Sequence, residues 1–230
     1  IDERFTEYFA ARFDLPLVIA SYRSRQDTPA GVGRAVAALR QANYILAGPG
    51  SPTYAVRQWK DSPVWQALVE RWQAGAQAVF ASSAAVAIGR HTLPVYEIYK
   101  VGAPLHWIDG LDLLGPAGFD LAIVPHWDNT QGGTHDTGAC FVGMERFLRL
   151  RSMLPASTVI LGIDEHTACM IDLDAGGLDV RGRGGVTVLR GGEQHRLPSG
   201  TDASLDLLRP SSGLPSPPAE ATAEAPDLLA

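Results

Sequence analysis

The sequence predicts an α/β fold, a three-layer sandwich in which a mostly parallel, doubly wound sheet carries helices on both faces. Two observations support this prediction. Apolar, β-branched runs alternate with longer amphipathic segments over most of the chain, an order typical of parallel strands joined by crossover helices. Most of these runs are apolar almost without interruption, which is the pattern of strands buried on both faces of a sheet.

Each expected element has its own local signal. Strands are expected at the apolar runs over residues 15–21, 44–48, 76–82, 120–125 and 157–163. The helical spacing of apolar residues predicts helices over residues 28–42, 62–76 and 143–154. The first two helices begin with a Ser or Thr followed by Pro, a pair that favours a helix N-terminus.

The C-terminal part of the chain has a different pattern. Residues 168–197 hold short apolar runs separated by Gly-rich turns, which predicts short antiparallel strands at a sheet edge. Residues 210–230 are rich in Pro, Ser, Ala and Glu, and a segment with so little to bury is expected to form a disordered tail. We therefore expect a single α/β domain over residues 1–209 and a tail over residues 210–230.

Composition excludes several classes of protein. The chain has 230 residues, 46% of them hydrophobic, and a formal net charge of -6, so it offers no basic surface for nucleic acid. No apolar run reaches the ~20 residues that a membrane-spanning helix needs. The only cysteines, Cys140 and Cys169, are too few for a disulfide framework or a zinc ribbon and are expected to be buried free thiols. We therefore expect a cytoplasmic protein that binds neither nucleic acid nor a membrane.

Polar or glycine residues follow four of the expected strands. They are a Gly-rich turn at 48–50, the adjacent Ser82 and Ser83, His126, and the acidic pair at 164–165. In an open α/β sheet, ligands bind at the carboxyl ends of the strands. A serine, a histidine, a carboxylate and backbone N–H groups are the parts of a serine hydrolase. We therefore predict that these parts meet at one edge of the sheet.

The serine pair has two interpretations. Residues 81–85, Ala-Ser-Ser-Ala-Ala, take the place of a G-x-S-x-G elbow, with alanine at both glycine positions. On this alignment Ser83 is the nucleophile, and Ser82 precedes it on the strand. The alternative is a serine that only caps the following helix.

The histidine and the carboxylate are assigned by their positions. His126 directly follows an apolar strand and Pro125, so the sheet is expected to fix its backbone. His135 follows two glycines, which suits a loop that closes over substrate. We therefore expect His126 to be the base. Glu165 is expected to face it, and Asp164 to serve the local turn.

These motifs resemble a known family. GIDEHTA at 162–168, followed by short strands with GRGGVTVL and preceded by a serine elbow and a strand-end PHW, is similar to the cyanophycinase and aspartyl dipeptidase family of serine peptidases, within the class I glutamine amidotransferase-like superfamily. The resemblance covers roughly residues 15–190. It implies that Ser83, in a partial match to an S-A-G-A motif, is the nucleophile, His126 the base and Glu165 the third member of the triad.

The resemblance also implies a substrate and an oxyanion site. The expected substrate is a small peptide or related amide, and no cofactor is expected. Because Pro49 has no N–H, Gly50 and the N–H of Ala84 are the expected oxyanion donors. The family's first strand lies upstream of residue 1, so the domain is expected to lack it. Whether the protein forms a homodimer stays open.

Substrate-binding residues are expected in two segments. Residues 93–115 are rich in polar aromatic and charged side chains. This composition fits a wall of the substrate pocket and, equally, a surface hairpin. After the histidine, a Gly-containing stretch precedes the first arginine, whereas the family has closely spaced arginines there. The candidates are Tyr96, Lys100, Trp127, His135 and Arg146.

Two other functions stay open. His126, His135 and Asp136 share one loop, and imidazole and carboxylate ligands suit a divalent metal ion, so a metal-dependent hydrolase is one alternative. The altered serine elbow also allows a catalytically silent relative that serves as a binding or scaffold domain. Metal analysis of the purified protein separates the metal-dependent hydrolase from the serine hydrolase. A fluorophosphonate probe separates the silent relative, because only an activated serine reacts with it.

Overall fold

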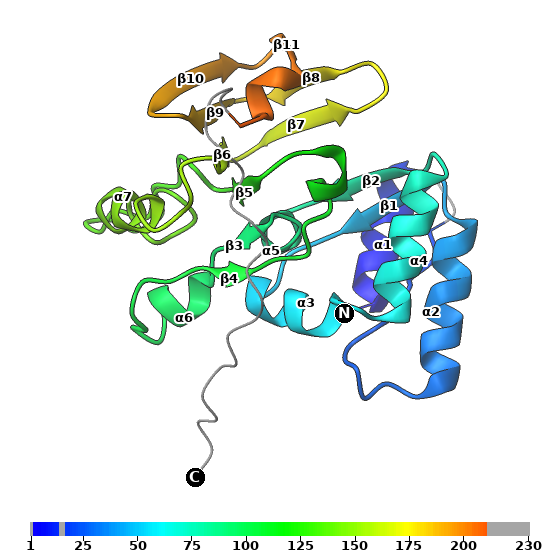
Figure 1. Ribbon diagram of the computed structural model, residues 1–230. Coiled ribbons are helices and arrows are strands. Elements are labelled where there is room, and N and C mark those ends of the chain that lie inside the picture. The colour runs from blue at the N-terminus through cyan, green and yellow to red at the C-terminus, as the bar shows by residue number, and fades with distance from the viewer. Residues whose placement is uncertain (1, 14–16, 211–230) are drawn as a thin grey trace.

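The computed structural model describes residues 2–13 and 17–210, which form a mixed α/β fold. Strand β1 (Tyr44–Ala47) pairs in parallel with β2 (Gln77–Phe80), and β5 (Leu121–Val124) pairs in parallel with β6 (Val159–Ile163). The short helix α5 (Ser83–Ala87) contacts both β2 and β5 and lies between the two pairs (Figure 1). These four strands lie at four of the five positions that the apolar runs predict.

The other strands pair antiparallel. They are β3 (His91–Thr92), β4 (Ile108–Asp109), β7 (Thr167–Asp172), β8 (Gly177–Gly182), β9 (Gly185–Arg190), β10 (Glu193–Pro198) and β11 (Asp202–Ser204). Strands β9 and β10 extend the second parallel pair into a sheet of order β10-β9-β6-β5, and β7, β8 and β11 form a sheet of order β11-β8-β7. The predicted antiparallel strands after residue 166 are therefore confirmed.

Seven α-helices and two 3-10 helices are found among the described residues. They are α1 (Asp2–Phe13), α2 (Pro29–Gln41), α3 (Pro52–Trp59), α4 (Pro63–Gln73), α5 as above, α6 (Val95–Tyr99), α7 (Met144–Arg151), η1 (Gly115–Ala117) and η2 (Leu205–Leu208). The side chains of Thr28, Ser51 and Ser62 cap α2, α3 and α4, each directly before a proline. The Ser/Thr-Pro signal therefore predicted the starts of α2 and α4 correctly.

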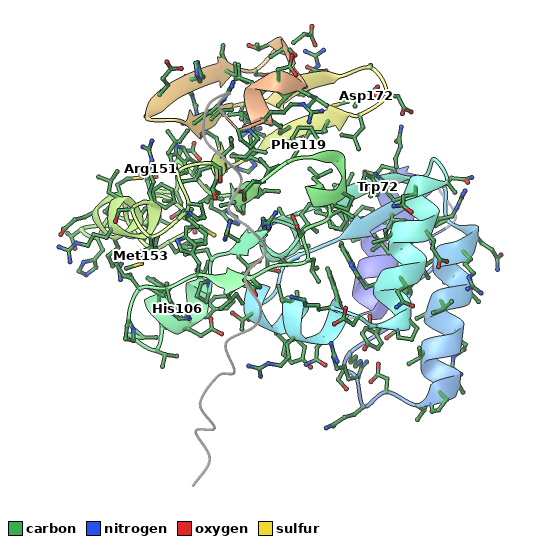
Figure 2. All side chains as sticks on the ribbon, viewed as in Figure 1. Trp72, His106, Phe119, Arg151, Met153 and Asp172 are labelled. Carbon is green, nitrogen blue, oxygen red and sulfur yellow. The ribbon has the colours of Figure 1, made fainter. Side chains whose placement is uncertain are left out.

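Strands β5 and β6 are buried on both faces, as their unbroken apolar sequence predicts. On one face, Leu121 and Leu161 pack in a cluster with residues of β8, β9 and η2, and this cluster includes Phe119, which is labelled in Figure 2. On the other face, Ala122 and Ile160 pack with residues of α6 and α7. Helices therefore cover one face, and the antiparallel strands cover much of the other.

The sheet and the first strand differ from the prediction. Within the described residues, no strand hydrogen-bonds the pair β1-β2 to the pair β5-β6, so the expected parallel sheet is divided. The described part of the predicted strand at 15–21 forms no strand. Instead, Ala20 and Tyr22 pack against the apolar cluster of α2, α4 and β1, and the Tyr22 hydroxyl donates to the Gln58 carbonyl at 3.1 Å. Side-chain packing holds this segment in place of strand pairing.

Two further expectations concern the chain as a whole. The predicted tail lies outside the described residues from residue 211 onward. No helix in the described part of the chain has the length and hydrophobicity that crossing a bilayer requires.

Candidate active site

A serine, a histidine and a glutamate from three strand ends form a hydrogen-bonded chain. The Oγ atom of Ser82 lies 3.0 Å from Nε2 of His126. The Nδ1 atom of His126 lies 2.9 Å from Oε1 of Glu165. The three residues follow β2, β5 and β6, respectively. The structure thus brings polar residues together at the carboxyl ends of these strands, as expected.

These contacts assign the two ring nitrogens. A carboxylate only accepts hydrogen bonds, so Nδ1 of His126 carries the proton and donates it to Glu165. Nε2 is then left to accept the hydrogen bond that the Ser82 hydroxyl donates. This is the tautomer in which a histidine can take a proton from a serine.

Ser82 lies in a strained turn between β2 and α5. Its backbone has φ 55° and ψ -118°, a conformation that costs a residue other than glycine about 1–3 kcal/mol. The residues that follow are small and tightly packed, with Ala84 0% and Ala85 5% exposed. A sharp strand-to-helix turn of this kind presents a serine hydroxyl at the edge of a sheet.

The assignment of Ser83 as the nucleophile does not fit this geometry. Ser83 is the first residue of α5, is 5% exposed, and donates its hydroxyl to the carbonyl of Gly48 at 3.3 Å. β2 ends at Phe80, earlier than the apolar run indicates, so Ser82 and not Ser83 contacts His126. The helix-cap alternative does not describe Ser82 either, since its side chain makes no capping hydrogen bond.

The expected oxyanion donors also change by one residue. The N–H of Ala84 donates to the Ala81 carbonyl at 3.2 Å and is therefore already engaged. Among the described residues, the N–H groups of Ser83 and Gly50 have no protein acceptor. A Cβ added to Gly50 would lie 3.5 Å from the Ser83 hydroxyl, so the glycine turn borders the elbow. Ser83 and Gly50 are thus the candidate donors, the first because it follows the serine in contact with the base.

His126 is held from several directions. Its backbone φ is 52°, another value that is rare outside glycine. Its carbonyl accepts a hydrogen bond from Cys140 N at 3.1 Å. The ring of Phe141 lies 5.3 Å from the imidazole, measured between centroids. The segment after the histidine therefore folds back and packs against the imidazole.

Trp127, a candidate for substrate binding, packs into the fold. A Cβ added to Gly162 would lie 2.5 Å from the indole ring, so the ring rests directly on this position of β6. The same indole meets the ring of Phe147 edge-on at 5.0 Å. Its backbone N–H donates to the Ile163 carbonyl at 3.0 Å. Trp127 thus anchors the chain next to His126.

Glu165 is bound by two residues of the loop that follows His126. Nδ2 of Asn129 donates to Oε1 of Glu165 at 2.7 Å, and the N–H of Glu165 donates to Oδ1 of Asp128 at 2.7 Å. Hydrogen bonds from Asn129 and then His126 hold the pKa of the Glu165 carboxyl below its ordinary value. The carboxylate is therefore charged at neutral pH and can stabilise a protonated imidazole.

Asp164 has a separate structural role. Its carboxylate is 4% exposed, accepts a hydrogen bond from Gly185 N at 2.8 Å and pairs with the guanidinium of Arg196. These contacts tie the end of β6 to β9 and β10. The sequence predicted a role in the local turn for Asp164, whereas its side chain joins residues of two distant strands.

Proteins similar to this chain are found among solved structures. No protein-family model matches the chain, and no curated protein matches its sequence. A solved peptidase from an acI-B1 Actinobacterium is similar, with a TM-score of 0.58 and 21% identity over 74% of this chain and 62% of that one. The two proteins share a fold. A candidate Peptidase E protein from Listeria monocytogenes EGD-e is also similar, with a TM-score of 0.44 and 16% identity over 79% of this chain and 68% of that one.

The shared fold supports the family resemblance of the sequence motifs at the level of architecture. The chain spans 62% of the length of the acI-B1 peptidase, which is less than two thirds.

The aromatic and charged side chains of α6 and of the segment after it, residues 96–106, lie in different places. The ammonium of Lys100 lies 4.4 Å from the ring centroid of Tyr96, so these two exposed side chains contact each other. Tyr99 instead lies beside Phe141, the residue that packs on His126, with 6.1 Å between the ring centroids of Tyr99 and Phe141. His106 lies at the outer margin of the molecule (Figure 2), where it hydrogen-bonds the Pro104 carbonyl at 2.8 Å. The surface alternative therefore describes His106, while Tyr99 borders the site.

The metal-site alternative finds no support in the arrangement of the loop. His135 is exposed. Asp136 accepts hydrogen bonds from Met144 N at 2.7 Å and Gly138 N at 2.8 Å, and these bonds lower the pKa of its carboxyl. Arg146 contributes a smaller electrostatic lowering of the same pKa. Over residues 2–13 and 17–210, no three His, Cys, Asp or Glu side chains gather as metal ligands.

The two thiols are poor nucleophiles. Burial raises the pKa of Cys140 to about 12, and burial followed by the charge of Asp179 raises that of Cys169 to about 12. A thiol must ionise to react. The backbone N–H of Cys140 contacts the carbonyl of His126, but the imidazole nitrogen that is free to accept a proton contacts the hydroxyl of Ser82.

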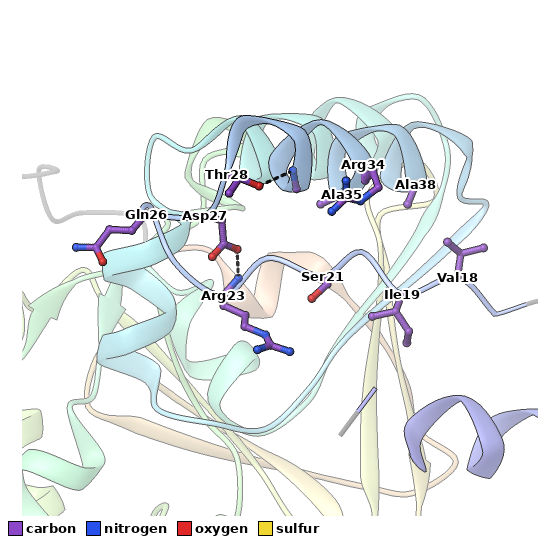
Figure 3. Close-up of a pocket in the computed structure, with 11 residues that line it drawn as sticks. Val18, Ile19, Ser21, Arg23, Gln26, Asp27, Thr28, Arg34, Ala35 and Ala38 are labelled. Atoms are coloured by element: carbon purple, nitrogen blue, oxygen red, sulfur yellow. Dashed lines mark hydrogen bonds between the residues drawn. The ribbon is translucent and has the colours of Figure 1, made fainter. Parts of the chain in front are cut away.

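Two cavities lie away from the triad. The first, of about 560 Å³, is a groove between the segment 18–28 and α2, with Arg23, Asp27 and Arg34 on its walls (Figure 3). The second, of about 250 Å³, lies between the end of α7 and the β9-β10 turn. Neither is lined by Ser82, His126 or Glu165.

Three residues at the site were not assigned their place by the sequence analysis. They are Ser82, Asn129 and Phe141. Ser82 was named only as the residue before the expected nucleophile, because S-A-G-A matches at two of four positions whether the alignment begins at Ser82 or at Ser83. Asn129 stands three residues after the histidine, where an amide beside an aspartate is a recognisable signal. Phe141 had no local signal, because it reaches His126 only through the fold of the loop.

Proposed function

We propose that the protein is a serine hydrolase that cleaves a peptide or related amide bond. Ser82 is the nucleophile, His126 the general base and acid, and Glu165 the orienting carboxylate. The observation that carries the proposal is the relay from Ser82 through His126 to Glu165, with contacts of 3.0 and 2.9 Å. The strained φ of Ser82 supports it, because such strain concentrates at functional residues.

The reaction follows from these contacts. Nε2 of His126 takes the hydroxyl proton as Oγ of Ser82 attacks the carbonyl carbon, and the imidazolium that forms is stabilised by the carboxylate of Glu165. The oxyanion is received by the N–H groups of Ser83 and Gly50. The imidazolium then protonates the leaving amine, and a water molecule, activated by the same histidine, releases the acyl group from the serine.

The substrate class rests on the family resemblance and on the shared fold. We propose that the substrate is a small peptide that binds next to the aromatic side chains of Phe141 and Tyr99, beside the base. Their ring contacts with His126 and with each other support this placement. We also propose that the fold is the doubly wound, three-layer sandwich expected from the sequence. The two parallel strand pairs, whose carboxyl ends supply the triad, support this proposal.

A hydrolysis screen tests the proposal. The protein is incubated with dipeptides that include α- and β-aspartyl ones, beside the variants Ser82→Ala and Ser83→Ala. We expect Ser82→Ala to lose at least about 1,000-fold of any hydrolysis, as in serine hydrolases that lack their nucleophile. Equal rates in the wild type and Ser82→Ala would contradict the proposal. A folded wild type that cleaves nothing and reacts with no serine-directed probe would favour the silent relative.

A further inference from the structure

The loop that follows His126 places an asparagine amide against the carboxylate of the triad. Nδ2 of Asn129 lies 2.7 Å from Oε1 of Glu165, and the same oxygen accepts the hydrogen bond from Nδ1 of His126 at 2.9 Å. Asn129 is 3% exposed. A buried amide thus shares one carboxylate oxygen with the imidazole.

The orientation of this amide is fixed by its other partners. Oδ1 of Asn129 accepts a hydrogen bond from Gln131 N at 3.1 Å, so Nδ2 must be the atom that faces the carboxylate. The backbone of Asn129 is held as well, because its N–H donates to the His126 carbonyl at 3.3 Å and its carbonyl accepts from Thr137 Oγ1 at 3.2 Å. The residue therefore has little freedom to release the carboxylate.

Without such a donor, Glu165 could turn away from the histidine. Its side chain is 25% exposed, and water can compete for a carboxylate at that exposure. His126 and His166 are the groups whose charge favours the ionised carboxylate, and Asp128 is the acidic neighbour, which accepts from the Glu165 N–H. Asn129 is the only one of these partners that is both buried and able to donate to Oε1 without changing its charge.

We propose that Asn129 is a positioning residue of the triad. It holds Oε1 of Glu165 in line with Nδ1 of His126 and favours the charged carboxylate. The Gly-containing loop at 126–143 therefore helps to orient the base. This inference rests on the proposed function for its effect on rate, although the contact itself is independent of it.

Two substitutions of Asn129 separate positioning from folding. Asn129→Ala removes both the donor and the acceptor of the side chain. Asn129→Asp keeps the size and the acceptor for Gln131 N, but brings a second carboxylate to the oxygen of Glu165, so the two acids should share a proton and titrate as a pair. Thr137→Val is the matched control, because it removes the hydroxyl that braces the same loop through Gly132 N and the Asn129 carbonyl.

The experiment follows two properties of the four proteins across pH. NMR of carboxyl-labelled glutamate gives the pKa of Glu165, and the rate of reaction with a fluorophosphonate probe reports the activation of the serine. In Asn129→Ala we expect a raised pKa of Glu165 and a probe rate lower by roughly 10- to 100-fold. In Asn129→Asp we expect the probe rate to fall as the shared proton is lost with rising pH. Thr137→Val should shift the pKa of Glu165 less than Asn129→Ala does, because the amide donor to Oε1 remains.

The outcomes distinguish the two claims. An unchanged pKa of Glu165 in Asn129→Ala, or an equal shift in Thr137→Val, would overturn the positioning role. A wild type that does not react with the probe would contradict the proposed function, while the titration of Glu165 would still decide whether Asn129 holds the carboxylate. If Asn129→Ala fails to fold, the pH profile of Asn129→Asp gives the answer, because aspartate is close to asparagine in shape.

Discussion

Oγ of Ser82 lies 3.0 Å from Nε2 of His126, although the two residues are 44 positions apart in the chain. Both have a positive φ, 55° for the serine and 52° for the histidine. Strain of about 1–3 kcal/mol at each of two residues that face each other is not explained by a need for stability. It is explained if the fold holds the hydroxyl and the imidazole in position for chemistry.

The two histidines of the loop should behave differently. His126→Ala should abolish reaction with a fluorophosphonate, because the base that contacts Ser82 is lost. His135→Ala should react at close to the wild-type rate, since this residue is exposed and its backbone contact is to Gly132. The measurement is the second-order labelling rate of each folded variant. Loss of labelling in His135→Ala alone would mean that another histidine serves as the base.

The neighbouring acids should separate activity from stability. Glu165→Gln should keep the fold and lower the labelling rate at least about 100-fold, because an amide cannot stabilise an imidazolium as a carboxylate does. Asp164→Asn should lower the free energy of unfolding by about 1–3 kcal/mol, since it weakens the buried contacts to Gly185 N and Arg196. Labelling rates and urea unfolding curves measure the two effects. The reverse pattern would exchange the roles of the two acids.

The carboxyl of Asp120 should make stability depend on pH. Burial raises its pKa, but hydrogen bonds from His91, Ser157 and Thr158 outweigh burial and leave the pKa lowered. A carboxyl with a lowered pKa in the folded state stabilises the protein above its ordinary pKa, and this contribution disappears as the pH falls through the folded-state value.

The variant Asp120→Asn isolates that contribution. At neutral pH it should unfold with a free energy lower by about 1–3 kcal/mol, because the charged acceptor of three hydrogen bonds is gone. The difference from the wild type should shrink as the pH falls below about 4. Urea unfolding over a range of pH measures it. A difference that stays constant down to acid pH would mean that the charge of Asp120 contributes nothing.

Gly162 should be intolerant of a side chain. A Cβ there would lie 2.5 Å from the ring of Trp127, so Gly162→Ala should destabilise the fold by about 1–3 kcal/mol and displace the residue next to His126. Gly177→Ala is the control, because a Cβ on this strand glycine meets open space. Thermal unfolding and labelling rates should show a loss of both stability and reactivity in the first variant only. Two variants of equal stability would contradict the packing argument.

Much of the fold was predictable because its signals are local. The unbroken apolar runs of β5 and β6 require burial on both faces, and the Ser-Pro and Thr-Pro pairs supply both a capping oxygen and a residue without an N–H at the start of α4 and α2. The division of the sheet was not predictable in this way. Strand pairing joins segments far apart in the chain, and the run at 17–21 has a strand-like composition but packs by side chains instead.

The site was predictable to within one residue for the same reason. Strand-end position located His126 and Glu165, because the end of an apolar run is visible in the sequence. The choice between Ser82 and Ser83 depends on where β2 stops and on the backbone dihedral angles of one turn, and no pattern of residue types fixes those. Asn129 and Phe141 depend on the path of an irregular loop, which brings them back to His126 and Glu165 through contacts between distant positions.

The most direct test of the account is the location of a covalent adduct. The protein is treated with a fluorophosphonate, and tandem mass spectrometry identifies the modified residue in the wild type and in the Ser82→Ala and Ser83→Ala variants. The account predicts an adduct on Ser82, retained in Ser83→Ala and absent from Ser82→Ala, because the Ser82 hydroxyl contacts the free nitrogen of His126 whereas the Ser83 hydroxyl donates to the Gly48 carbonyl. An adduct on Ser83, or no adduct on any serine of the folded protein, would contradict it.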